Sequence, residues 1–386
     1  MRTITAATLW DGTTLLNHPV LSIEDGRIAS IAARAPGQPD GAHHFPAATL
    51  APAFFDVHIH GAAGHDVMEA TPEALATIGS FLATRGTGSF LATTVTAPLD
   101  TTLKALDGLA RLIDHPDSVS SSGPTTKPIG IHLEGPFLSH AKCGVQPKEH
   151  LLEPDISTFD KLYQAAGGHA RLITLAPELP GAIELAAHAT ARGVRVSVGH
   201  SNATAAETRA AIAAGAVSAT HTFNAMRALD HREPGILGTV LTTETLFAEL
   251  ICDGIHTDPA IVDLWWRAKG PERAVLVTDA MSAAGMPDGE YRLGGFPVQV
   301  ANGRAMARGV LAGSVLTLDR ALANFTRFTG APLHHALRLL TVNPAAMTGF
   351  SAQTGSIAAG QPANLVAVDA QGKLLASFIN GQLAAA

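Results

Sequence analysis

Two histidines separated by one residue stand in an apolar, strand-like segment, FFDVHIH. Alternate side chains of a β-strand point to the same side, so His58 and His60 could hold one metal ion together. With 18 histidines among 386 residues, chance supplies roughly one His-x-His pair, and a strand with two ordinary polar residues is the alternative explanation. The pair becomes informative only together with the ends of the other apolar runs.

Eight short apolar runs end in side chains that can ligate a metal or act as an acid. In chain order these residues are His58 and His60, Thr94, Glu134, Glu178, His200, His221, His256 and Asp279. The carboxyl ends of barrel strands converge on one face, where the active sites of barrel enzymes lie. Random placement on helices and loops would not end apolar runs with such groups repeatedly, so we predict a metal site at this face.

The ligand types indicate the chemistry. Imidazole nitrogens and carboxylate oxygens suit zinc, with iron or manganese as alternatives. A divalent ion lowers the pKa of a bound water to near neutrality and polarises a carbonyl, which makes amide hydrolysis feasible. The amine leaving group needs a proton, which a carboxylate can take from the water and hand on. Asp279 is the candidate, and a buried Asp that caps a helix is the alternative.

The elements that position these residues alternate from about residue 53 to residue 340. Strands are predicted at 54–60, 88–95, 128–134, 171–178, 194–200, 217–223, 247–256 and 274–280. Helices are predicted at 72–85, 100–114, 157–167, 181–192, 203–214, 258–269 and 314–328. Eight parallel strands with intervening helices favour an α/β fold, a (β/α)8 TIM-like barrel, over an open doubly wound sheet.

The two ends of the chain depart from this alternation and show short strands with turns such as Asp11-Gly12 and Asp25-Gly26. We expect residues 1–52 and 350–386 to form one small β-sandwich domain beside a barrel of residues 53–349. The glycine-rich stretch 281–312 is predicted to be a hairpin insertion after the eighth strand.

Composition excludes several classes of protein. Hydrophobic residues make up 46% and charged residues 15%, and the formal net charge is −7, which excludes intrinsic disorder and argues against nucleic-acid binding. Cys143 and Cys252 are too few and too far apart for a disulfide framework or a cysteine zinc site, which indicates a reducing compartment. The sequence shows no signal peptide and no run of 18 apolar residues. We expect a soluble, cytoplasmic protein with no membrane partner.

Seven motifs together carry a family resemblance. They are His58-x-His60, His132-Leu133-Glu134-Gly135-Pro136-Phe137, Gly199-His200-Ser201, Thr220-His221-x-Phe223-Asn224-Ala225-Met226, Arg232-Glu233-Pro234-Gly235, Asp253-Gly254-x-His256 and Thr278-Asp279-Ala280. In this order they resemble the N-acetylglucosamine-6-phosphate deacetylases of the amidohydrolase superfamily. The likeness spans almost the whole chain and includes the tail from Gly355 to Leu365. HLEGP and Asn-Ala-Met are specific to this family, whereas His-x-His and a late Asp are shared by many amidohydrolases.

The resemblance implies that Glu134, His200 and His221 bind one metal ion and that Asp279 is the acid/base residue. Some family members have amides in place of the first-strand histidines and keep a single ion. This chain retains His58 and His60, so whether one ion or two bind stays open, with Glu134 as the bridging ligand of a pair. No lysine that could be carbamylated to bridge two ions stands at a strand end.

The resemblance also implies substrate contacts. Asn224, the backbone of Ala225, Arg232 and His256 match positions that hold the sugar and its phosphate, and guanidinium and imidazole groups bind phosphate well. A solvated charge beside Glu233 is the alternative for Arg232.

Two further segments are candidate contacts. Leu311, Ala312 and Gly313 resemble a loop that closes over the sugar, although such residues also serve ordinary turns. Val145 and Gln146 stand where family members usually have Ala-His. Glutamine donates a hydrogen bond but carries no positive charge, so this departure leaves the identity of the sugar open.

The leading hypothesis is metal-dependent deacetylation of N-acetyl-D-glucosamine 6-phosphate to glucosamine 6-phosphate and acetate, in amino-sugar catabolism. The partner is then a small amino-sugar phosphate, and the resemblance implies a homodimer. A second hypothesis keeps the chemistry but changes the substrate to N-acetylgalactosamine 6-phosphate, an unphosphorylated N-acetyl sugar or another N-acyl amine. A third, a catalytically silent barrel, predicts a missing ligand or a missing Asp279, whereas every expected position is filled.

Overall fold

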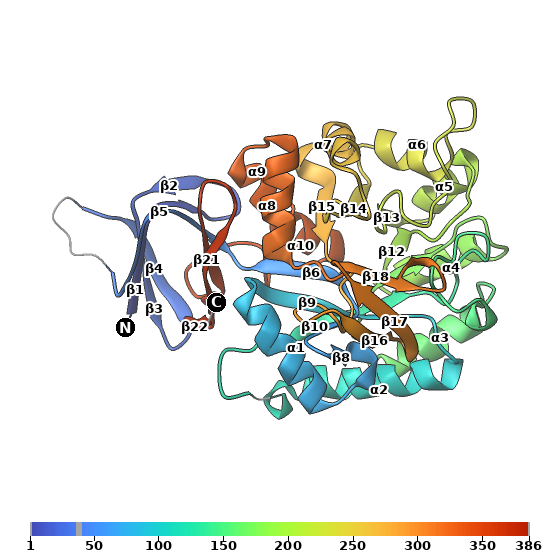
Figure 1. Cartoon of the computed structure of the whole chain (residues 1–386), viewed down its shortest axis with the longest axis horizontal. Coiled ribbons are helices and arrows are strands. Elements are labelled where there is room, and N and C mark those ends of the chain that lie inside the picture. Colours follow the sequence, from blue (N-terminus) through green and yellow to red (C-terminus); the bar gives the residue numbers. More distant parts are fainter. Residues whose placement is uncertain (1, 36–40, 120, 385–386) are drawn as a thin grey trace.

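The computed structural model describes residues 2–35, 41–119 and 121–384 (Figure 1). Its centre is a barrel of eight strands: β6 (Phe54–Ile59), β9 (Thr87–Thr94), β10 (Pro128–Glu134), β11 (Ala170–Leu175), β12 (Arg195–Val198), β13 (Ala216–Ala219), β14 (Phe247–Ile251) and β15 (Ala274–Val277). Each strand pairs in parallel with the next, and a parallel bridge between Ile59 and Ala280 joins the end of the series to its start. The (β/α)8 barrel predicted from the sequence is confirmed.

Helices follow the strands and cover the barrel. They are α1 (Pro72–Thr84), α2 (Leu99–Asp114), α3 (Ile156–Ala165), α4 (Ala182–Ala191), α5 (Ala205–Ala213), α6 (Gly235–Thr242), α7 (Pro259–Arg273), α8 (Leu318–Thr329), α9 (Leu333–Arg338) and α10 (Val342–Thr348). Local capping explains several starts, because the Thr71 side chain accepts from the N–H of Ala74, and Thr204 and Glu207 form a capping box. The seven predicted helices are present, and α6, α9 and α10 add to them.

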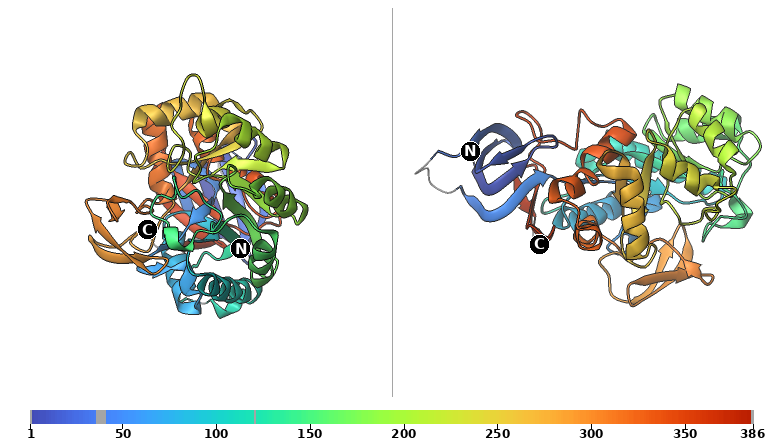
Figure 2. Two further views of the ribbon diagram at one scale, coloured as in Figure 1. Left: turned by 90° about the vertical axis from the view of Figure 1, so that its right-hand side faces the viewer. Right: turned by 90° about the horizontal axis from the view of Figure 1, so that it is seen from above.

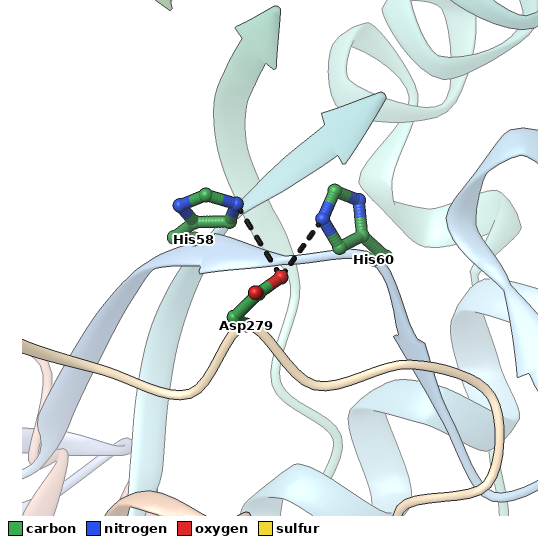
Figure 3. A group of neighbouring side chains, drawn as sticks. All are labelled: His58, His60 and Asp279. Atoms are coloured by element: carbon green, nitrogen blue, oxygen red, sulfur yellow. Dashed lines mark ion pairs between the residues drawn. The ribbon is translucent and has the colours of Figure 1, made fainter. Parts of the chain in front are cut away.

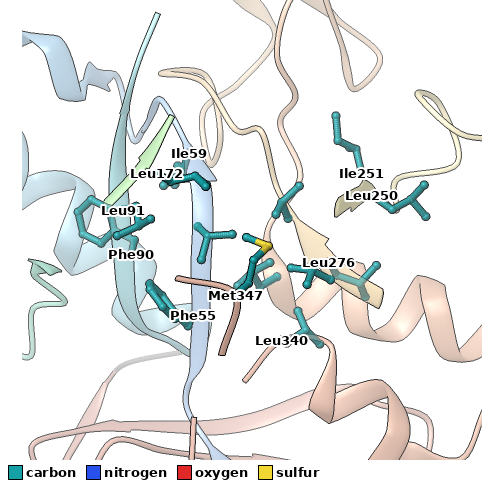
Figure 4. Close-up of a cluster of buried hydrophobic side chains, with 14 of the residues drawn as sticks. Phe55, Ile59, Phe90, Leu91, Leu172, Leu250, Ile251, Leu276, Leu340 and Met347 are labelled. Carbon is teal, nitrogen blue, oxygen red and sulfur yellow. The ribbon is translucent and has the colours of Figure 1, made fainter. Parts of the chain in front are cut away.

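Apolar side chains pack the strands against the helices (Figure 4). All six residues of β6 are buried, including Phe55, which lies edge-on to Phe350 with ring centroids 5.8 Å apart. Leu276 on β15 and Met347 on α10 belong to the same cluster. A strand buried on both faces is held firmly, which fixes the residues at its carboxyl end.

Both ends of the chain build a second sheet beside the barrel (Figures 1 and 2). It contains β1 (Arg2–Trp10), β2 (Leu15–Asn17), β3 (Pro19–Glu24), β4 (Arg27–Ala33), β5 (His43–Pro52), β20 (Leu365–Val368), β21 (Leu374–Ile379) and β22 (Gln382–Ala384). The antiparallel pair β5–β20 joins the two ends, and Leu21, Leu50 and Phe378 lie in a core of their own. This is the small β domain expected from the sequence, and the division of the chain at residues 52 and 350 stays a prediction.

The insertion after β15 is a four-stranded antiparallel sheet, larger than the expected hairpin. It consists of β16 (Gly289–Leu293), β17 (Phe296–Ala301), β18 (Arg304–Ala307) and β19 (Val310–Leu311), paired in sequence order. Figure 2 shows it projecting from the barrel. Its core contacts Val95 and Val145, so the insertion packs against loops at the carboxyl ends of the barrel strands. A short pair, β7 (Gly61–Ala62) and β8 (His65–Asp66), follows β6.

None of the described helices is both long enough and apolar enough to span a bilayer.

Candidate active site

His58 in β6 and His60, the residue after that strand, point toward Asp279, which lies two residues beyond β15 (Figure 3). Asp279 Oδ1 lies 3.1 Å from His60 Nε2 and 3.6 Å from His58 Nε2. Closure of the barrel brings them together, because the Asp279 N–H donates to the His58 carbonyl and the His60 N–H to the Ala280 carbonyl. These three buried residues form the first triad.

Glu134, His200 and His221 form the second triad; Glu134 ends β10, and the two histidines lie two residues beyond β12 and β13. Glu134 Oε1 lies 3.1 Å from the Nε2 atom of each histidine. The same oxygen lies 3.3 Å from His58 Nε2, and Glu134 Oε2 lies 3.4 Å from His60 Nε2. Glu134 therefore stands between the two triads and contacts both.

Three of these six residues have backbones in the left-handed region, with φ of 45° at His200, 28° at His221 and 50° at Asp279. Non-glycine residues adopt this region rarely, and such strain gathers at functional sites. It turns these side chains inward just where their strands end. Local backbone geometry thus supports the convergence that the sequence pattern predicts.

The outer nitrogens of three histidines are anchored. Nδ1 of His60 lies 3.0 Å from the Thr93 carbonyl, Nδ1 of His200 lies 3.0 Å from the Lys142 carbonyl, and Nδ1 of His58 lies 3.2 Å from Glu249 Oε2. A carbonyl only accepts, so His60 and His200 carry a proton on Nδ1, and Nε2 is the nitrogen that each ring turns toward the carboxylates of the triads. Nε2 of His58 is buried without a hydrogen-bond partner. Imidazole nitrogens and carboxylate oxygens gathered in this way suit a cation.

The charges lead to the same conclusion. Burial disfavours a charged carboxylate, but His58 and the hydrogen-bonded imidazoles around Glu134 outweigh burial and hold the pKa of Glu134 well below its ordinary value. His58 and His60 overcome burial at Asp279 and lower its pKa to about 2. In return, Asp279 and Glu134 overcome burial at His60 and raise its pKa to about 9. Anionic carboxylates in this buried place need positive charge beside them, which divalent cations would supply.

A cavity of about 260 Å³ opens onto both triads. Of the residues expected to contact substrate, it is lined by Val145, Gln146, Asn224, Ala225, His256, Leu311 and Gly313. Ala312 is fully buried in the core of the insertion, and Arg232 is exposed on the loop before α6, outside this lining. Leu293 and Val310 of the insertion also line the cavity, and their apolar side chains gave no signal of this in the sequence.

Gln146 is buried and lies against Glu134. Its Nε2 donates to Glu134 Oε2 at 2.6 Å, and its Oε1 accepts from the Thr96 N–H at 2.8 Å. The amide therefore holds one oxygen of Glu134 while it also faces the cavity. At the position where family members usually have histidine, this chain therefore has a glutamine that holds the Glu134 carboxylate in place.

His256 is held by Asp253, three residues before it. Asp253 Oδ2 lies 2.7 Å from His256 Nδ1, and Asp253 Oδ1 accepts the N–H groups of Ile255 and His256. Burial alone would raise the pKa of Asp253, but His256 and these N–H groups lower it. With Nδ1 engaged, Nε2 is the ring nitrogen left for a ligand in the cavity.

Two of the strand-end residues that the sequence predicted to face the site, Thr94 and Glu178, lie outside both triads and outside the cavity lining. Thr94 is buried, and Glu178 accepts hydrogen bonds from the Ser201 hydroxyl and the Asn202 N–H. Glu178 thus fixes the loop after His200 and does not face the site.

Comparison with known proteins identifies the family. The amidohydrolase family model matches residues 49–384. N-acetylgalactosamine-6-phosphate deacetylase of Escherichia coli is 40% identical over 96% of this chain and 95% of its own, and N-acetylglucosamine-6-phosphate deacetylase of Bacillus subtilis is 36% identical over 96% and 93%. The N-acetyl-D-glucosamine-6-phosphate deacetylase structure from Mycobacterium smegmatis, in complex with N-acetyl-D-glucosamine-6-phosphate, superposes with a TM-score of 0.92 at 35% identity, covering 100% and 99% of the two chains. The chain therefore belongs to the amidohydrolase family and, within it, to the family of N-acetylglucosamine-6-phosphate deacetylases that its motifs resemble.

Proposed function

We propose that this protein removes the acetyl group from N-acetyl-D-glucosamine 6-phosphate, giving glucosamine 6-phosphate and acetate in amino-sugar catabolism. The observation that carries the proposal is the meeting of two buried triads, joined by Glu134, at one cavity. Membership of a family of metal-dependent amide hydrolases supports it. The substrate is inferred from the relatives, which are named N-acetylglucosamine-6-phosphate deacetylases.

We assign the two triads to two divalent ions. Glu134, His200 and His221 would hold one ion, and His58, His60 and Asp279 would hold the other, with Glu134 between them. Nitrogen and carboxylate ligands favour zinc, with iron or manganese as alternatives. Divalent ions bound here would polarise the acetamide carbonyl of the substrate and lower the pKa of a water.

Asp279 carries the proton in the proposed reaction. It lines the cavity and is held ionised by His58 and His60. A carboxylate in this state accepts a proton from the attacking water and then delivers it to the nitrogen of the leaving amine.

The remaining cavity residues bind the substrate. Leu293 and Leu311 exclude water from above the triads, while Asn224 and His256 offer polar contacts to the sugar and its phosphate. Arg232 keeps its assignment as a phosphate partner only if the exposed loop that carries it closes over the substrate. We also propose, from the family resemblance, a cytoplasmic homodimer, which light scattering on the purified protein would test.

N-acetylgalactosamine 6-phosphate is the second candidate substrate. A specific observation favours it, because the Escherichia coli relative of that name shares 40% identity over nearly the whole chain. The glutamine at position 146 also departs from the usual family pattern on the cavity wall.

Acetate release from four sugars tests the function directly. We expect the metal-loaded protein to hydrolyse N-acetylglucosamine 6-phosphate at least about tenfold faster, as kcat/KM, than unphosphorylated N-acetylglucosamine, because charged hydrogen bonds to the phosphate add binding energy. The 6-phosphate and the free sugar of N-acetylgalactosamine form the second pair. A faster reaction with the galactosamine phosphate would assign the second substrate, and equal rates with phosphorylated and free sugars would overturn the phosphate site.

Asp253→Asn should weaken phosphate recognition. Losing the carboxylate removes the charge that fixes His256, so we expect KM for the 6-phosphate to rise about tenfold while kcat changes less than about twofold. Steady-state kinetics on the phosphorylated and free sugars measures both. Asp258→Asn is the matched control, because Asp258 lies in the same loop and its side chain caps α7 by accepting the Ala260 N–H. A fall in kcat at unchanged KM would remove this role from the Asp253–His256 pair.

A further inference from the structure

One buried carboxylate beside the site belongs to neither triad and does not line the cavity. Glu249 lies in the middle of β14, in the run Phe247–Ile251, and its side chain is 0% exposed. It is the one charged residue of that strand. A buried charge is costly unless it is paired and hydrogen-bonded, so its retention in the barrel core calls for a partner.

Its partners are ligands of both proposed ions. Glu249 Oε2 lies 3.2 Å from His58 Nδ1 and accepts the backbone N–H of His221 at 3.3 Å. His58 belongs to the first triad and His221 to the second. One buried carboxylate therefore contacts both triads, at Nδ1 of His58 and at the backbone of His221.

The anchor of His58 differs from those of His60 and His200. Backbone carbonyls of Thr93 and Lys142 anchor the outer nitrogens of His60 and His200, whereas a side-chain carboxylate anchors His58. A carboxylate accepts more strongly than a carbonyl, fixes the proton on Nδ1 and makes Nε2 a better donor to a metal. The strength with which His58 binds a metal can therefore be changed by a side-chain substitution at Glu249, whereas a substitution cannot remove the backbone carbonyls that anchor His60 and His200.

Of the three imidazole rings packed on that of His58, the nearest belongs to His132, and it cannot take over this task. The ring of His132 lies 4.7 Å from that of His58, edge to face. Both nitrogens of His132 are engaged elsewhere, Nδ1 with the Val57 carbonyl and Nε2 with the Thr174 hydroxyl. His132 therefore has no ring nitrogen left to accept the Nδ1 proton of His58 if Glu249 is removed.

We propose that Glu249 is the positioning residue that presents His58 to the second divalent ion and thereby decides whether this enzyme works with two ions or one. The inference rests on the assignment of two ions under the proposed function. Glu249 acts through His58 and is not itself among the residues that line the substrate cavity. Its contact with the His221 backbone ties the same carboxylate to the neighbouring triad.

Metal stoichiometry and affinity test the proposal without any assay of turnover. Wild type, Glu249→Gln and Glu249→Leu are loaded with zinc, titrated with a competing chelator and analysed for zinc per chain. We expect the wild type to hold two ions and Glu249→Leu to bind the second about 10- to 100-fold more weakly, with the first ion little affected. Glu249→Gln keeps a neutral acceptor, so its second ion should weaken by a smaller factor.

Glu207→Gln and Glu207→Leu are the matched controls, since Glu207 accepts hydrogen bonds from Thr204 in the capping box of α5 and belongs to neither triad. Both should keep two ions at wild-type affinity. Unchanged affinity in Glu249→Gln and Glu249→Leu would overturn the proposal, and if Glu249→Leu does not fold, unchanged affinity in Glu249→Gln alone does so. A wild type with a single ion that still releases acetate would overturn the inference and leave the proposed function standing.

Discussion

Exchanging Glu134 for glutamine should remove both ions and lower kcat/KM at least about 10³-fold, since bound divalent ions contribute several kcal/mol to such reactions. Glu134 contacts His200, His221 and His58 through Oε1 and His60 through Oε2. The amide keeps the shape but loses the negative charge that these four imidazoles surround. Elemental analysis of the purified variant and acetate release from the 6-phosphate measure the two effects.

Glu149→Gln is the matched control for this exchange. Glu149 lies in the same loop region but on the surface, in a 3.9 Å ion pair with Arg308. It should retain full metal content and full activity. If Glu134→Gln kept either ion at wild-type affinity, Glu134 would not be the shared ligand of the two triads.

The barrel could be predicted because each of its strands carries its own signal. Runs such as AVLV at β15 are buried on both faces, so they are continuously apolar and the helical pattern between them is distinct. The insertion was predicted only as a hairpin, although Gly294-Gly295 and Asn302-Gly303 each mark a turn, with positive φ at all four residues. Its strands are short and half exposed, so their apolar pattern is weaker.

The site was predictable where a ligand ends an apolar strand, as at Glu134 and Asp279. Glu249 was missed because its role depends on a contact with His58, 191 residues away in sequence, that exists only once the barrel has closed. A single acidic residue inside the apolar run FAELI was the available signal. Arg232 illustrates the opposite case, because a motif indicates its type but not whether its loop reaches the cavity.

Asp279→Asn should lower kcat by about 10² to 10⁴-fold, the range that a positioned acid/base group supplies. The amide cannot accept the proton of the attacking water, so no proton reaches the leaving nitrogen by this route. Asp279 contacts His58 and His60 but belongs to the first triad only. The ion held by Glu134, His200 and His221 should therefore remain, and zinc analysis beside single-turnover acetate release measures both properties.

The control separates proton transfer from structure. Asp288→Asn changes a surface carboxylate in the segment between Asp279 and β16, where it accepts the Asn302 N–H at 2.9 Å, and it should leave kcat unchanged. KM of Asp279→Asn should stay within about threefold of wild type, because its loss acts on the chemical step and not on binding. Activity above about a tenth of wild type would assign the proton to another group. If Asp279→Asn lost every ion, Asp279 would be needed to build the metal site. The fall in kcat would then be explained by the loss of metal and would not support a role in proton transfer.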